Sequence, residues 1–144
     1  MSYKGRFYPK NPKKYQGNPN NIIWRSTWEK KIMERFDLDS NVLHWCSEEL
    51  FVPYYDPSSR KQRRYFPDFI IQIKTEYGTK VIMIEVKPKK QTSQPKKPAS
   101  GRTTRRYISE CLTYKTNEAK WEAAQNYCDL KGWTFQILTE DEIF

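Results

Sequence analysis

The sequence predicts a single mixed α/β domain in which a sheet of about four strands is flanked by helices. Three observations lead to this fold class. The chain has 144 residues, which is the length of one domain and is enough to bury a core. Apolar residues alternate with polar ones along 68–87, as they do in strands. Along 27–36 and 107–131 they recur every three or four residues, as they do in helices.

The first 21 residues differ in composition from the rest of the chain. Residues 1–21 are polar and rich in proline and asparagine, so we expect an extended arm here and the domain proper over 22–144. The aromatic residues of this arm, which alternate with lysine and arginine, include Tyr3, Phe7, Tyr8 and Tyr15. This pattern can stack on nucleic-acid bases, or it can simply hold the arm against the domain.

A helix is predicted over about 27–36. Apolar residues at four-residue spacing give it a buried stripe, formed by Trp28, Ile32 and Phe36. Ser26 stands at the expected N-cap, and Glu29 follows three residues later, which is the pattern of a capping box. The cap by itself can therefore account for Glu29.

Three strands are predicted next. The stretch "EELFVPYYDP" suggests the first, with Pro53 at an edge or bend and "DPSSR" as the loop that closes it. Two further strands flank a turn at 75–78. One face of this pair is wholly apolar and is expected to be core; it carries Phe69, Ile71, Ile73, Ile82, Ile84 and Val86. Three charged residues fall on the opposite face, namely Asp68, Glu85 and Lys87.

The register of this hairpin follows from its apolar face. With the turn at 75–78, Ile70 faces Met83, and the next pair along places Asp68 opposite Glu85. A slip of one residue would put the two apolar faces out of step, so the core supports this register.

Residues 88–106 form a low-complexity stretch with three prolines and no acid, so we expect a mobile surface loop. Because its basic residues repel one another and cannot pack together, the loop is expected to bind a polyanion such as DNA. Its seven basic residues are Lys89, Lys90, Lys96, Lys97, Arg102, Arg105 and Arg106. Helical spacing then resumes at Tyr107, with Asn117 as the expected cap of a further helix and Gly132 as its end. A final strand is predicted at "WTFQIL", and "TEDE" resembles a helix start.

The composition narrows the classes of partner. The net charge is +9 and the pI is near 9.4, which favours a polyanion, most often nucleic acid; a basic surface can also serve solubility alone. No apolar run approaches the roughly 18 residues of a membrane span, and the N-terminus lacks the apolar core of a signal peptide. We therefore expect no membrane partner and a location in a cytoplasm, or in a particle assembled there.

Cysteine and histidine, which bind zinc, are few in this sequence, whereas acidic residues are common. Cys46, Cys111 and Cys128 include no CxxC pair, so neither a zinc site nor a disulfide framework is expected, and His44 is the single histidine. Two carboxylates directly opposite on neighbouring strands have Cβ atoms roughly 5 Å apart and repel each other. A divalent cation between them reverses the sign of the interaction, and oxygen ligands suit Mg²⁺ or Mn²⁺.

Lys87 shares the face of the two acids. An ammonium there can orient a metal-bound water or stabilise charge on a phosphate, so the three residues predict a site of phosphodiester hydrolysis. Alternatively, Glu85 and Lys87 form an exposed salt bridge on a solvated face.

The motifs "PDF" and "EVK", with seventeen residues from Asp68 to Glu85, resemble the PD-(D/E)xK nuclease superfamily. Its core order of helix, three strands, helix and strand agrees with the order expected here. More closely, the chain resembles the head completion nucleases of T4-like phages, relatives of the transposase endonuclease subunit TnsA. The matching stretches cover nearly the whole chain; they are "RSTWEKKI", "RRYFPDFII", "IEVKPKK", "TNEAKWEAAQ" and "ILTED".

The resemblance implies a restriction-endonuclease-like fold and a magnesium-dependent endonuclease acting on double-stranded DNA. It implies that Asp68, Glu85 and the backbone carbonyl of Val86 hold the metal and that Lys87 is the catalytic lysine. It also implies that Glu29 completes the acidic cluster. The accessory residues that it implies are Lys120 and Gln125.

The resemblance further implies a role in late head maturation, on packaged DNA or its end, with head and portal proteins as partners and the host cytoplasm or the virion head as location. Two other classes stay open. One is a DNA-binding virion protein without catalysis. The other is a structure-specific, junction-type nuclease, which uses the same site but normally needs a dimer; no obvious dimer-forming apolar segment is found in the sequence.

Overall fold

A four-stranded mixed sheet lies at the centre of the protein, in a computed structural model that describes residues 4–144. The strand order is β3 (Val42–Ser47), β6 (Phe69–Thr75), β7 (Gly78–Val86) and β8 (Thr134–Leu138). β6 pairs antiparallel with both β3 and β7, whereas β8 lies parallel to β7. The predicted α/β class with a mixed sheet of four strands flanked by helices is confirmed.

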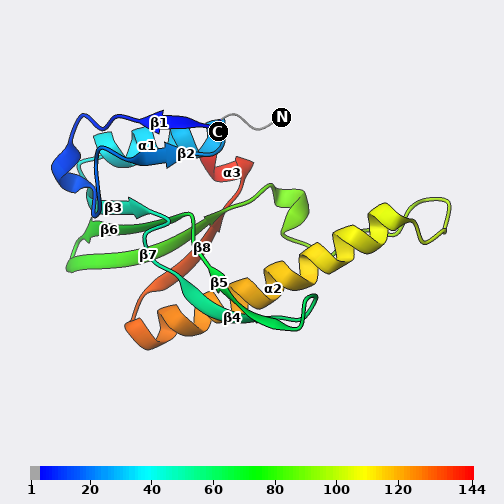
Figure 1. Cartoon of the computed structure of the whole chain (residues 1–144). Helices are drawn as coiled ribbons and strands as arrows, with labels where there is room; N and C mark the ends of the chain where they lie inside the picture. Colours follow the sequence, from blue (N-terminus) through cyan, green and yellow to red (C-terminus); the bar gives the residue numbers. More distant parts are fainter. Residues whose placement is uncertain (1–3) are drawn as a thin grey trace.

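One face of the sheet is covered by α1 (Thr27–Leu38) together with the strand pair of β1 (Gly5–Phe7) and β2 (Ile22–Trp24) (Figure 1). The short helix α3 (Glu140–Ile143) lies on this side too. The core between these layers joins apolar residues of α1, the sheet and α3, among them Ile32, Met33, Phe36, Phe69, Ile71, Ile82, Ile84 and Ile143. The apolar face predicted for β6 and β7 therefore packs against α1.

The other face is covered by α2 (Arg105–Lys131) and by the hairpin of β4 (Val52–Asp56) and β5 (Lys61–Tyr65) (Figure 1). A second core forms there, where Met83 of β7 meets buried residues of α2 and of the hairpin, namely Val52, Tyr54, Tyr65, Ala124 and Cys128. The N-terminal half of α2 projects beyond the sheet (Figure 1).

The N-terminal segment belongs to the domain, which corrects the expected division at residue 21. That division falls between β1 and β2, which pair with each other. Phe7 and Tyr15 are buried against Trp45, with ring centroids 5.8 and 4.8 Å apart respectively. Of the two possibilities for the aromatic residues, these two hold the segment against the sheet, because burying an aromatic ring is more favourable than leaving it in water. Tyr3 lies outside the described residues.

The hairpin of β6 and β7 has the predicted register. Ile70 pairs with Met83 and Gln72 with Val81. Two features of the neighbouring strands were predicted wrongly. The stretch expected as the first strand of the main sheet forms β4 of a separate two-stranded sheet, and the edge strand of the main sheet is β3. β3 was missed because a register shift between Val42 and His44 interrupts its alternation.

A single helix, α2, replaces the two helices expected around Asn117. The helix is capped by Thr104, whose side chain accepts a hydrogen bond from the Tyr107 N–H, and it ends at Gly132 in the left-handed conformation, as predicted. Asn117 is buried in mid-helix. The β4–β5 turn contacts Leu112 and Thr116, in the two turns before this point, and the helix continues through Asn117 without a break.

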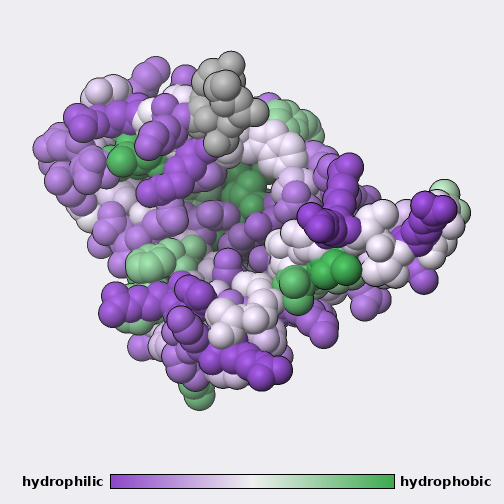
Figure 2. Space-filling view, turned by 45° about the vertical axis from the view of Figure 1, so that its right-hand side comes forward, coloured by the Kyte–Doolittle hydropathy of each residue, from purple (hydrophilic) through white to green (hydrophobic). Residues whose placement is uncertain are grey.

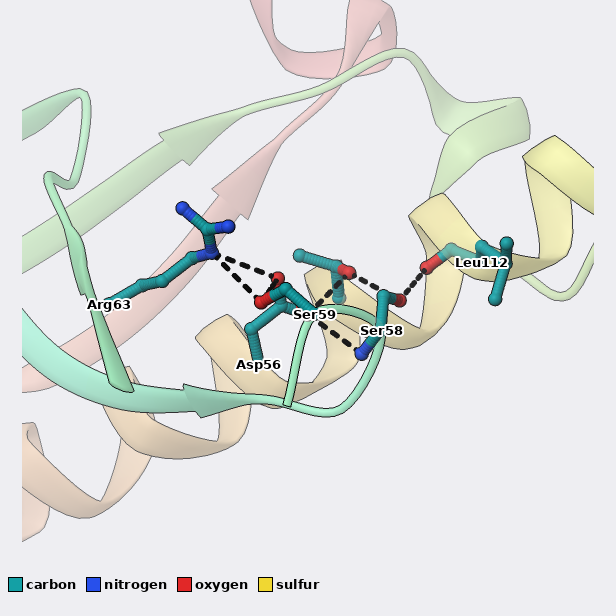
Figure 3. Close-up of polar contacts among 6 residues, drawn as sticks. Asp56, Ser58, Ser59, Arg63 and Leu112 are labelled. Atoms are coloured by element: carbon teal, nitrogen blue, oxygen red, sulfur yellow. Dashed lines mark hydrogen bonds and ion pairs between the residues drawn. The ribbon is translucent and has the colours of Figure 1, made fainter. Parts of the chain in front are cut away.

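These contacts centre on the buried carboxylate of Asp56 (Figure 3). It accepts hydrogen bonds from the Ser58 N–H (3.0 Å), the Ser59 hydroxyl (2.8 Å) and the Thr116 hydroxyl (2.9 Å), and Arg63 forms an ion pair with it at 3.2 Å. The Ser58 hydroxyl also donates to the Leu112 carbonyl at 3.2 Å. The turn of the hairpin is thereby tied to α2.

The segment after β7 contains a 3-10 turn, η2 (Lys89–Gln91), and then has no regular secondary structure up to α2. A second 3-10 turn, η1 (Pro12–Lys14), follows β1. None of the helices within residues 4–144 has the length and apolar content required to cross a membrane.

Candidate active site

Three segments far apart in the sequence meet around one pocket of about 460 Å³. The N-terminal turn of α1 contributes Glu29, the residue before β6 is Asp68, and the end of β7 and the residue after it contribute Glu85 and Lys87. Val86 lines the pocket as well. All five residues predicted for catalysis or metal binding are therefore brought together.

Asp68 lies one residue beyond the last pair of the hairpin ladder, Phe69 with Ile84. Its Oδ2 accepts a hydrogen bond of 2.7 Å from the Val86 N–H, which fixes the carboxylate beside the end of β7. Burial and the nearby charge of Glu85 raise the pKa of Asp68 well above its usual value, and Glu29 adds to this effect. The two acids thus repel each other across the strands, as the register predicted.

Glu85 is buried and held from both sides. The Tyr65 hydroxyl donates a hydrogen bond to its Oε2, and the Lys87 ammonium lies 3.5 Å from its Oε1. Burial raises the pKa of Glu85 above its usual value, although Tyr65, Lys87 and Lys120 all act to lower it. The alternative of an exposed salt bridge between Glu85 and Lys87 is wrong, since Glu85 is 7% exposed.

Lys87 has a fixed backbone and a partly exposed side chain. Its N–H donates to the Leu138 carbonyl at 3.0 Å, which extends the pairing of β7 with β8 by one residue. The side chain thereby leaves the sheet at the pocket, within reach of an anion that enters it.

Of the two hydrogen bonds of the expected capping box, Glu29 forms only the one that its backbone N–H donates. The Ser26 hydroxyl accepts from the Glu29 N–H at 3.1 Å, but the helix shows no return bond from the Glu29 carboxylate to the Ser26 N–H among residues 4–144. Instead Oε1 is buried and has no hydrogen-bond partner in this part of the chain. Burial and the charge of Glu48 raise the pKa of Glu29. The Ser26 hydroxyl lies 3.4 Å from Oε2, so Oε1 is the atom that is available to a ligand in the pocket.

The pocket fits a hard divalent cation. Buried carboxylates with raised pKa values are stabilised by a nearby positive charge, and the orphaned oxygen of Glu29 lacks a donor. Within residues 4–144, however, no three His, Cys, Asp or Glu side chains stand close enough to hold a metal together. A cation in this pocket would therefore take at most two of these carboxylates as direct ligands, and an ion such as Mg²⁺ commonly binds in this way, with water completing its shell.

Four of the seven predicted DNA-binding residues line one groove, and the other three lie outside it. Lys89, Lys90, Lys96 and Arg106 line a groove of about 1220 Å³ beside α2, which shares Pro88 and Gln91 with the pocket. The remaining three, Lys97, Arg102 and Arg105, are exposed but do not line it. Two of the seven side chains are paired with acids, Lys89 with Asp141 at 3.0 Å and Arg106 with Glu110 at 3.0 Å.

The two accessory residues lie in different surroundings. Lys120 is close enough to Glu85 to lower its pKa and stands 5.9 Å from the centre of the Tyr65 ring. Gln125 is exposed, donates to Asp129 at 2.9 Å and does not line the pocket.

Tyr65 is the contact that sequence reasoning missed. It lies on β5, a strand that was not predicted, and its hydroxyl reaches Glu85 because the β4–β5 hairpin packs beside the end of β7. A buried tyrosine three residues before the motif aspartate was the one available signal.

Two comparisons with known proteins show what the chain is similar to. The profile of the family described as "TnsA-like endonuclease N terminal" matches residues 39–140, a range that includes Asp68, Glu85 and Lys87. The chain is also 42% identical, over 143 residues, to the head completion nuclease of Enterobacteria phage T4, covering 98% of this chain and 93% of that protein. Because the family model matches more than half of its residues, the chain belongs to the TnsA-like endonuclease family.

Proposed function

We propose that the protein is a metal-dependent DNA endonuclease whose active site is formed by Glu29, Asp68, Glu85 and Lys87. The observation that carries the proposal is their convergence on one pocket from three separate segments of the chain. Grouping three acids in one buried place is unfavourable for the fold itself, because like charges repel each other. A function of the site would explain why the three acids and a lysine are brought together. Membership in an endonuclease family is consistent with this assignment.

Each residue has a distinct role in the proposed reaction. Asp68, Glu85 and the carbonyl of Val86 hold the cation, which is Mg²⁺ or Mn²⁺ in this proposal. The bound ion supplies a Lewis acid that activates water and neutralises phosphate charge. Lys87 orients the attacking water or stabilises the charge that develops on the phosphate. Glu29, with its orphaned oxygen, accepts a hydrogen bond from a water in the pocket.

The biological setting is proposed from the relative. The T4 relative is named a head completion nuclease and is similar over nearly its whole length. We infer that this protein acts at the same stage, on packaged DNA or its end, in the host cytoplasm or the assembling head. Head and portal proteins are its proposed partners.

The direct test is cleavage of plasmid and linear DNA with Mg²⁺, Mn²⁺ or EDTA. We expect cleavage with either ion and none in EDTA. Asp68→Ala and Glu85→Ala should abolish cleavage but leave DNA binding intact, because both acids repel phosphate when no ion is bound. Glu76→Ala is a matched control, since Glu76 lies in the exposed turn at the opposite end of the hairpin.

Two results would contradict the proposal. Cleavage by Asp68→Ala at the wild-type rate would remove the assigned site. Binding without cleavage under all three conditions would make the protein a DNA-binding component, with the pocket serving another purpose.

A further inference from the structure

The outer face of the β4–β5 hairpin has no role in the site described so far. In β4, Val52, Tyr54 and Asp56 are buried toward α2, so the alternate residues Pro53 and Tyr55 face solvent. Phe51 and Phe66, which flank the hairpin at its open end, are 44% and 41% exposed, and Tyr55 is 52% exposed. Exposed aromatic rings on and beside one small sheet are unusual for a surface in contact only with water, and exposed apolar patches commonly mark binding surfaces.

The aromatic rings are combined with positive charge. The Phe51 and Phe66 rings lie with centroids 5.8 Å apart, and the guanidinium of Arg64 sits 4.8 Å from the centre of the Phe51 ring. Arg60 and Lys61 are exposed at the far end of the hairpin. The only acid in residues 51–66 is Asp56, which is buried and used by the turn. The face therefore carries uncompensated positive charge, which excludes a basic partner and favours an anionic one.

The hairpin is placed beside the proposed active site. Tyr65, at the open end of the hairpin, donates a hydrogen bond to Glu85, and the chain continues from it through Phe66 to Asp68. Phe66 and Asp68 are two residues apart, so their Cα atoms are at most about 7.6 Å from each other. Successive phosphates along one strand of a duplex are separated by a rise of about 3.4 Å. A strand with a phosphate at Asp68 therefore has neighbouring nucleotides within reach of Phe66.

From these observations we infer that the outer face of the β4–β5 hairpin binds unpaired nucleotides adjacent to the phosphate held in the pocket, with Phe51 and Phe66 stacking on bases and Arg64 binding the backbone. This inference rests on the proposed function and specifies its substrate as DNA with a single-stranded segment, such as a tail or an open end. A duplex alone offers no base faces to these rings, because its bases are already stacked within the helix. Stacking platforms next to basic residues are the usual means of binding single strands.

The projecting half of α2 is a separate feature. Figure 2 shows hydrophobic patches on an otherwise largely hydrophilic face, and Ile108 and Leu112 are exposed on this helix. The hairpin differs from it in carrying aromatic rings with cations directly beside the site, so its ligand can be specified.

The inference is tested by binding in EDTA, without cleavage. Fluorescence anisotropy would compare a blunt duplex with the same duplex carrying a short single-stranded tail. We expect tighter binding of the tailed duplex. In Phe51→Ala/Phe66→Ala this preference should fall by between about fivefold and a hundredfold, the loss expected for removing base stacking. Affinity for the blunt duplex should stay unchanged.

Two control variants separate stacking from folding. Phe51→Tyr/Phe66→Tyr keeps the rings and should retain the preference. Tyr77→Ala removes an aromatic ring that is 94% exposed in the β6–β7 turn, away from the site, and should behave as wild type. A 2-aminopurine in the tail should lose fluorescence on binding to wild type but not to the alanine double variant, because stacking quenches it.

Equal affinity of wild type for blunt and tailed DNA, or a preference that survives the alanine double variant, would overturn the inference. Because the binding assay needs no metal, either result leaves DNA cleavage and the proposed function untouched. Conversely, a protein that prefers tailed DNA through these rings but cuts nothing would refute the endonuclease proposal alone.

Discussion

At the scale of single residues, Glu85 is the most constrained carboxylate of the pocket. Tyr65 holds one of its oxygens and Lys87 stands near the other, so the carboxylate is oriented before any ion binds. Glu29 differs, because its Oε1 has no partner within residues 4–144. The first acid is positioned by the fold, and the second is left to interact with whatever enters.

Tyr65→Phe should destabilise the protein and weaken its response to divalent ions. The change removes a buried hydrogen bond to a charged group, worth about 1.5–3 kcal/mol. Urea unfolding would measure the free energy, and the ion concentration for half of the rise in Tm would report the metal response. Tyr55→Phe removes an exposed hydroxyl of the same strand pair and should change neither quantity. Wild-type values for Tyr65→Phe would show that this contact does not position Glu85.

Glu29→Gln should leave stability equal to or above that of wild type and reduce cleavage by about a hundredfold or more. The cap is retained because the Ser26 hydroxyl accepts from the backbone N–H of residue 29, and a buried acid with a raised pKa is replaced by a neutral group. Glu34→Gln, on the exposed side of α1, is the control. A stable and fully active Glu29→Gln would restrict Glu29 to a structural role.

At the scale of elements, the β4–β5 hairpin and α2 act as a unit. The hairpin supplies Tyr65 to Glu85, and the Asp56 network ties the turn of the hairpin to α2 (Figure 3). Burial by itself acts to raise the pKa of Asp56, but hydrogen bonds from Ser59, Ser58 and Thr116 lower it below its usual value. The anchor is therefore strongest when Asp56 is ionised.

Asp56→Ala should release the hairpin and speed trypsin cleavage among the basic residues of β5. With its lowered pKa, Asp56 contributes stability that is present above its unfolded pKa and is lost as pH falls through the folded pKa. The wild-type hairpin should thus stay protected at neutral pH and loosen only in acid below the usual range of aspartate. Glu76→Ala, in the other hairpin's exposed turn, should keep wild-type protection. Equal cleavage rates for Asp56→Ala and wild type would contradict the anchor.

The basic loop is expected to contribute charge without adding to stability. Lys96→Ser/Lys97→Ser should weaken DNA binding on all sequences and make the slope of log affinity against log salt shallower by up to about two units, since each phosphate contact contributes about 0.9. Arg105 and Arg106 are left intact because they begin α2. Lys74→Ser/Lys80→Ser, exposed at the far end of β6 and β7, is the matched control. An unchanged slope would indicate that the loop docks on a protein instead.

At the scale of the whole molecule, we expect the buried carboxyl groups of the pocket to lower the free energy of unfolding when no cation is bound. Glu29, Asp68 and Glu85 all have pKa values raised by burial. For an acid with a raised folded pKa, the unfolding free energy is highest below the unfolded pKa and falls as pH rises toward the folded pKa. The protein is therefore less stable near neutral pH than the fold alone would make it.

Divalent ions should reverse this loss. We expect Mg²⁺ or Mn²⁺ to raise the Tm of wild type by mass action. In EDTA, Asp68→Asn should melt higher than wild type, with a difference that grows as pH rises above the usual carboxyl range. The same variant should lose most of its response to metal. Calorimetry across pH, with and without ions, measures both effects; a wild type that does not respond to millimolar ions would count against the metal site.

The features that could be predicted from the sequence are local ones. The alternation along 68–87 set the register of β6 and β7 and hence placed Asp68 opposite Glu85, because side chains point to opposite faces with a period of two. In the same way Ser26 marked the start of α1 and Gly132 the end of α2. These features depend on neighbours a few residues apart, so they can be read from spacing.

The features that depend on contacts between distant segments could not be predicted from the sequence. The register shift concealed β3, the Asp56 network tied the β4–β5 turn to α2 at Thr116, and α2 continues through Asn117 without a break. The packing of residues 4–21 against the sheet and the reach of Tyr65 to Glu85 likewise come from segments far apart in the chain. Such contacts are selected by the burial of apolar surface and the pairing of buried polar groups, which no short stretch of sequence encodes.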